Sequence, residues 1–95
     1  MLQYKAGFKY VEGGVHAQVV DFPAVITCGA DLTEARRLLT SALLDVAEAR
    51  LELGQELPPP NAQGSDPEMD FEEPIYLHLA ASSEVHQAPA GEVAS

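Results

Sequence analysis

The feature that most constrains this chain is the run of residues 29–54, which combines a helical spacing of apolar residues with signals at both ends. Asp31 can accept a hydrogen bond from the backbone amide of Glu34 while the Glu34 side chain reaches back, an Asp form of the capping box. Gly54 can adopt the left-handed conformation that often closes a helix. The sequence therefore predicts a helix over residues 32–53, about 33 Å long at about 1.5 Å per residue.

The predicted helix has a broad apolar side and a second, narrower apolar strip. At about 100° per residue the broad side gathers most of the apolar residues and is expected to face the core: Leu32, Ala35, Leu38, Leu39, Ala42, Leu43, Val46, Ala49 and Leu53. The narrow strip holds Leu44, Ala47 and Leu51. Its residues are either ordinary surface side chains or contacts for a second chain. The set of candidate partner or dimer contacts is this strip with Phe22 and Tyr76.

Four other stretches have the pattern of strands. Apolar and polar residues alternate with period two in most of them, and Glu12-Gly13-Gly14 supplies a tight turn between the first two. The predicted strands are residues 4–11, 15–20, 25–28 and 74–80. Strand, strand, strand, helix, strand predicts an α+β two-layer sandwich, with one long helix packed on one face of a mostly antiparallel sheet.

The other face of this sheet is expected to lack a helix. The alternation places polar and aromatic side chains on it: Lys5, Lys9, His16, Gln18, Tyr76 and His78. His16 and His78 could converge there, near Glu12 or Asp21, as a general acid and base. Histidines on a solvated strand face are the simpler interpretation, and we interpret Cys28 as a small core residue rather than a reactive thiol. The sequence thus predicts no catalytic, metal or cofactor site and no enzyme.

Length and composition bound the organisation of the chain. Its 95 residues allow one domain over residues 1–80, with a flexible acidic loop at 61–73 and a disordered tail at 81–95. A domain this small buries only about 60% of its unfolded surface, so dimerisation would add stability. We therefore expect a homodimer, held by the strip around Leu44 or by an edge of the sheet.

The charge and the sequence pattern limit the classes of molecule that this chain is expected to bind. Fifteen Asp and Glu residues against five Lys and Arg give a formal charge of -10, which disfavours binding to nucleic-acid phosphates and suits a basic protein. A single cysteine excludes an intramolecular disulfide. No stretch approaches the roughly 20 apolar residues of a membrane helix, and a cytoplasmic protein without membrane contact is expected.

Several of these motifs together resemble one family. They are the Asp21-Phe22-Pro23 step after the hairpin, Gly29 before a capped Leu-x-Glu-Ala helix start, and a helix closed by the run from Gly54 to Pro59. Over residues 4–80 the chain resembles the HicB-like antitoxin domain. The resemblance implies a non-catalytic module that neutralises a small basic toxin ribonuclease by covering its RNA-binding face.

Many members of that family carry a helix-turn-helix or ribbon-helix-helix module after the domain. Residues 82–95 have the composition of neither, so no direct nucleic-acid contact is expected. The competing prediction is a solitary small-ligand-binding or enzymatic domain, which would use the open sheet face around His16 and His78.

Overall fold

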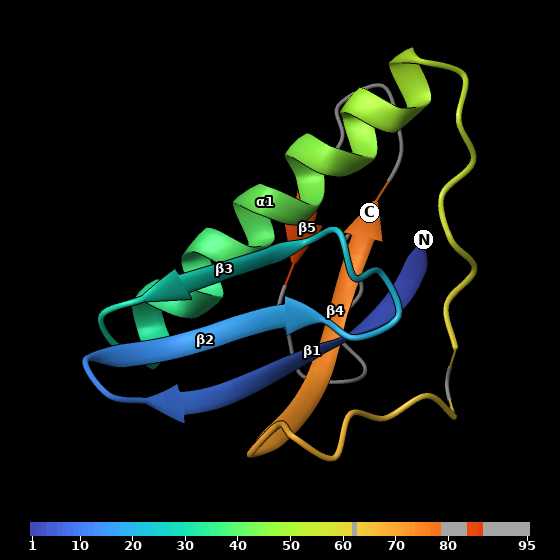
Figure 1. Cartoon of the computed structure of the whole chain (residues 1–95). Coiled ribbons are helices and arrows are strands. Elements are labelled where there is room, and N and C mark those ends of the chain that lie inside the picture. Colours follow the sequence, from blue (N-terminus) through green and yellow to red (C-terminus); the bar gives the residue numbers. More distant parts are fainter. Residues whose placement is uncertain (62, 79–83, 87–95) are drawn as a thin grey trace.

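The computed structural model describes residues 1–61, 63–78 and 84–86, and its fold is an α+β arrangement with one helix on one face of an antiparallel sheet (Figure 1). The predicted order of strand, strand, strand, helix, strand is confirmed, and the sheet order is β3-β2-β1-β4-β5. The elements are β1 (Leu2–Val11), β2 (Gly14–Val19), β3 (Ile26–Gly29), α1 (Leu32–Glu52), β4 (Phe71–His78) and β5 (Glu84–His86).

The core lies between α1 and the helix-facing side of the sheet. The alternation expected for the first two strands holds, because β1 and β2 pair with Phe8 opposite Ala17 and Ala6 opposite Val19. The buried apolar residues of the sheet and of the loop after β2 are Tyr4, Ala6, Phe8, Val15, Ala17, Val19, Phe22, Val25, Ile75 and Leu77.

Both predicted end signals of the helix are present. The Asp31 carboxylate accepts a hydrogen bond from the Glu34 amide at 2.8 Å, and the Glu34 carboxylate accepts one from the Ala30 amide at 2.9 Å. Gly54 follows the helix with a φ of 72°, a left-handed conformation that glycine adopts without strain. The capping box and the closing glycine therefore set the limits of α1.

The buried stripe of α1 differs in part from the predicted one. Its fully buried residues recur every four positions: Ala35, Leu39, Leu43 and Ala47. Four residues turn a helix by about 400°, so the stripe advances by about 40° around the helix per step. As a result Ala49 and Leu53, expected in the core, are exposed, whereas Ala47 is buried. The last turns of α1 extend past the start of β3 (Figure 1).

The fourth strand begins earlier than the sequence indicated. Residues 71–73 were expected in a flexible loop, but β4 starts at Phe71, which pairs with Phe8 of β1. The two rings stack with their centroids 5.1 Å apart. Just before the strand, the Asp70 amide donates to the Phe8 carbonyl at 2.8 Å. Aromatic stacking and these backbone bonds extend the pairing into the predicted loop.

A short fifth strand lies where the sequence indicated a disordered tail. Residues Glu84–His86 form β5, which pairs antiparallel with β4 and places Val85 opposite Leu77. Pairing along the outer side of β4 satisfies backbone groups that an edge strand would leave exposed. The remainder of the predicted tail, residues 81–83 and 87–95, lies outside the described residues. No helix among the described residues is long and apolar enough to span a membrane.

Candidate functional site

The end of α1 presents apolar side chains among carboxylates. Leu51 is 46% exposed and Leu53, the residue that ends the helix, is 72% exposed. Four exposed acidic residues occupy the same turns and the segment directly after them: Asp45, Glu48, Glu52 and Glu56. We refer to these six residues and the exposed Ala49 as the acidic end of α1. Exposed apolar side chains rimmed by polar residues can mark a protein contact surface.

The charges at the acidic end are unfavourable for the helix itself. A helix carries a partial negative charge at its C-terminus, so carboxylates in the last turns are repelled and cations are stabilised there. Arg50 is the basic residue of the last turn, and its guanidinium carbon lies 4.9 Å from the centroid of the Phe22 ring. Among the described residues none of the four carboxylates forms an ion pair. The charge at this end is therefore left for solvent or for another molecule.

The chain after α1 is fixed against the sheet. The Tyr4 hydroxyl donates a hydrogen bond to the Pro58 carbonyl at 2.7 Å. The Asp21 carboxylate accepts one bond from the Lys5 amide at 3.0 Å and another from the Asn61 amide at 2.8 Å. Burial, and then the negative charge of Asp21, raise the pKa of Tyr4 above its usual value of 10.0. These bonds hold residues 58–61 beside β1 and the loop after β2.

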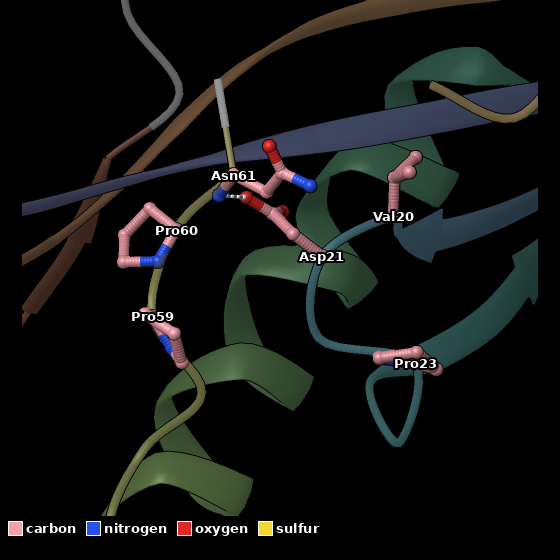
Figure 2. A pocket seen from close by; sticks show the side chains of 6 residues that line it. All are labelled: Val20, Asp21, Pro23, Pro59, Pro60 and Asn61. Atoms are coloured by element: carbon pink, nitrogen blue, oxygen red, sulfur yellow. Dashed lines mark hydrogen bonds between the residues drawn. The ribbon is translucent and has the colours of Figure 1, made fainter. Parts of the chain in front are cut away.

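A shallow groove of about 540 Å³ lies between this segment and the loop after β2, lined by Val20, Asp21, Pro23, Pro59, Pro60 and Asn61. Figure 2 shows Asp21 and Asn61 joined across it, with Pro23 on the side opposite Pro59 and Pro60. Because both Asp21 oxygens already bind backbone amides, the carboxylate holds the walls of the groove together. Asp21 therefore has a structural role.

The sheet register separates the two histidines that the sequence placed on one face. Lys9, near one end of β1, pairs with His16. Leu2, at the other end of β1, pairs with Leu77, and His78 follows Leu77. At about 3.3 Å per residue this corresponds to about 23 Å along the strand. His16 and His78 therefore cannot act together as a general acid and base, which excludes that alternative.

Cys28 is exposed rather than a core residue. It pairs with His16 across β2 and β3, so both side chains lie on the open face of the sheet. The short segment Val25-Ile26-Thr27-Cys28 has no clear alternation, and its apolar Ile26 also faces outward, 51% exposed. Among the described residues no group of three or more His, Cys, Asp or Glu side chains is placed to hold a metal ion.

The candidate contact residues fall in different environments. Phe22 and Ala47 are buried in the protein's own core and offer no surface in this conformation. Leu44 and Tyr76 are half-buried, and Leu51 is exposed within the acidic end of α1. Sequence reasoning missed Leu53 as a surface residue. It expected Asp45, Glu48 and Glu52 on the solvated side, as found, but did not connect them with the end of the helix, where carboxylates are least favourable.

Comparison with protein families and with curated proteins identifies no relative of this chain. No protein-family model matches the chain, and no curated protein matches its sequence. The functional assignment therefore depends on the fold, the exposed surfaces and their charge.

Proposed function

We propose that this chain is a non-catalytic protein-binding module that resembles the antitoxin of a toxin-antitoxin pair and neutralises a small basic toxin ribonuclease. The observation that carries the proposal is the acidic end of α1, where exposed Leu51 and Leu53 lie among carboxylates that have no basic partner in the described part of the chain. A basic protein with an apolar contact patch complements both properties of this surface.

The energetics favour such a partner at this position. Each carboxylate near the C-terminus of a helix costs about 0.3–1 kcal/mol at low ionic strength, and a nearby cation reverses the sign of that term. Lys or Arg side chains of a partner would therefore stabilise α1 as well as the complex. Negative charge on this chain would also accelerate the encounter with a basic protein, an effect that salt weakens.

The test starts with the tagged chain as bait in a lysate of the source cell, with mass spectrometry of what it captures. We expect a stoichiometric small basic protein whose ribonuclease activity falls on addition of this chain. Its affinity is then measured by calorimetry for Glu48→Lys with Glu52→Lys, and we expect a loss of at least about tenfold, equivalent to about 1.4 kcal/mol.

One control variant separates binding at the acidic end of α1 from a general effect of net charge. Glu12→Lys with Glu68→Lys makes the same charge change at exposed positions outside α1 and should leave the affinity within about threefold once salt screens long-range steering. An equal loss in both pairs contradicts docking at the acidic end.

The competing hypothesis of a ligand-binding or enzymatic domain is tested by His16→Ala with His78→Ala. The module hypothesis predicts unchanged partner affinity for this variant. Capture of no basic protein, together with loss of a measurable activity on RNA or a small ligand in the histidine variant, would favour the competing function. In that case each histidine must act without the other, given their separation along β1.

A further inference from the structure

The outer side of β3 carries backbone groups without a sheet partner. The Val19 amide of β2 donates to the Val25 carbonyl at 2.9 Å, which makes this a hydrogen-bonded pair of the antiparallel ladder. In such a ladder hydrogen-bonded and non-hydrogen-bonded pairs alternate. Thr27 therefore points its backbone groups toward β2, and Ile26 and Cys28 point theirs away from the sheet. We call this outer side of β3 the β3 edge.

No hydrogen bond within the described part of the chain occupies the N–H and C=O groups of Ile26 and Cys28. Natural proteins usually protect such an edge with a Lys, a Pro or an inward charge. The sequence Ile-Thr-Cys-Gly of β3 contains none of these, and Ile26 is 51% exposed. The opposite end of the sheet differs, because β5 covers the outer side of β4. The β3 edge can therefore form backbone hydrogen bonds with a strand of another molecule.

The distribution of charge indicates which protein supplies the additional strand. The chain has a formal charge of -10, yet neither β2 nor β3 contains an Asp or Glu residue. Lys9, His16 and Gln18 share the adjoining open face. Two copies of this chain repel each other over most surfaces but meet here without opposed strand carboxylates. A basic partner is drawn instead to the acidic end of α1.

We propose that two copies of this chain join through their β3 edges as antiparallel strands, with the two-fold axis at Thr27. This register places Ile26 of one copy opposite Cys28 of the other, and it uses all four outward backbone groups of each copy in four hydrogen bonds. The two sheets then continue as one. The proposal is independent of the proposed toxin-binding function.

The neighbouring registers shifted toward α1 fit the β3 edge less well. Antiparallel pairing requires residues of the same orientation to face each other, so Thr27 cannot face Cys28. A two-fold axis at Cys28 would pair Ile26 with Ala30 and would need the Ala30 amide. That amide already donates to the Glu34 carboxylate at 2.9 Å as part of the capping box. The axis at Thr27 requires no native bond to break.

The test is the mass of the untagged full chain in solution, measured by sedimentation equilibrium in reducing buffer from low to high micromolar concentration. Cys28→Pro removes an N–H that points away from the sheet, at a position where an edge strand accepts proline. We expect the wild type to sediment as a dimer and this variant to lose at least about tenfold in association, because two of the four intermolecular bonds disappear. Cys28→Ser keeps the N–H and should remain dimeric.

A second edge variant keeps the proposal testable if Cys28→Pro does not fold. Ile26→Lys places a charge on the β3 edge and should also weaken association, while circular dichroism reports an intact fold. Leu51→Asp alters the acidic end of α1 and should leave the mass unchanged. A monomeric wild type at high micromolar concentration overturns the proposal. So does a folded edge variant that stays dimeric, or a dimer that Leu51→Asp dissociates.

Discussion

The two ends of α1 differ in how their charges interact with the helix dipole. At the start, Asp31 and Glu34 place negative charge and hydrogen-bond acceptors where the helix amides need them. Gly29 allows a close approach, because a Cβ there would lie 2.6 Å from the backbone nitrogen of Ala35. At the far end, Glu48 and Glu52 oppose the helix dipole. The first end is organised for stability, whereas the second departs from it, which is typical of a surface that binds another molecule.

The largest expected difference in stability comes from replacing one leucine in the middle of α1 and one at its end by alanine. Leu39→Ala should lower the free energy of unfolding by about 2–5 kcal/mol, because Leu39 is fully buried and its removal leaves a cavity. Leu53→Ala, at a 72% exposed position, should cost less than about 0.5 kcal/mol. Urea denaturation measures both. Similar costs would mean that the acidic end is packed in solution.

The capping box at the first end should be worth less than the core. Asp31→Ala removes the side-chain acceptor for the Glu34 amide and should cost about 1 kcal/mol in unfolding free energy. Asp45→Ala, which removes an exposed carboxylate of the acidic end that makes no capping bond, serves as the control and should change stability by less than about 0.5 kcal/mol. An Asp31→Ala variant as stable as the control would show that the capping bond contributes nothing.

The segment that follows the acidic end should depend on Tyr4 and on pH. The Tyr4 hydrogen bond to the Pro58 carbonyl requires the protonated hydroxyl, and its loss in Tyr4→Phe should cost about 1 kcal/mol. Folding raises the pKa of Tyr4 above 10.0, so its contribution is complete below about pH 10 and is lost as the pH rises through the folded pKa.

Unfolding measured across this alkaline range should therefore show a smaller dependence on pH for Tyr4→Phe than for the wild type. Tyr10→Phe alters an exposed tyrosine and should retain the steeper dependence. Equal alkaline losses in wild type and Tyr4→Phe would contradict the role assigned to this hydroxyl.

Reversal of a charge should cause the smallest change in unfolding free energy, and this change should have opposite signs at the two ends of α1. Glu52→Lys replaces an unfavourable charge and should stabilise the protein by about 0.3–1 kcal/mol at low ionic strength, while Glu34→Lys should destabilise it by at least as much. Thermal unfolding at low and high salt measures both, and salt should reduce the gain from Glu52→Lys. Destabilisation by Glu52→Lys would mean that this carboxylate already supports the fold.

Much of the fold can be predicted from local patterns. The alternation from Tyr4 to Tyr10, the capping box at Asp31 and the closing Gly54 each act over a few residues, and the structure agrees with them. The unpredicted features depend on distant partners. Phe71 joins β4 because Phe8 lies opposite, and Val85 gives no periodic signal from which β5 can be foreseen.

The candidate site was only partly predictable for the same reason. Leu51 was selected from its helical position, but the rotation of the buried stripe moved Ala47 into the core and left Ala49 and Leu53 exposed. That rotation depends on which residues of α1 pack against the core, and helical periodicity alone does not contain this information. Cys28 was misplaced because β3 is short and lacks alternation, so its phase depends on pairing with β2.

The central position of β1 has a consequence for synthesis of the chain. Its first partner, β2, follows after a short turn, but Leu2 pairs with Leu77, near the end of the described sequence. Closing so long a loop is entropically costly and slow compared with hairpin formation. On the ribosome, the β1–β2 hairpin and α1 can therefore form before β4 has been synthesised. Until then the backbone groups on the β4 side of β1 have no strand partner.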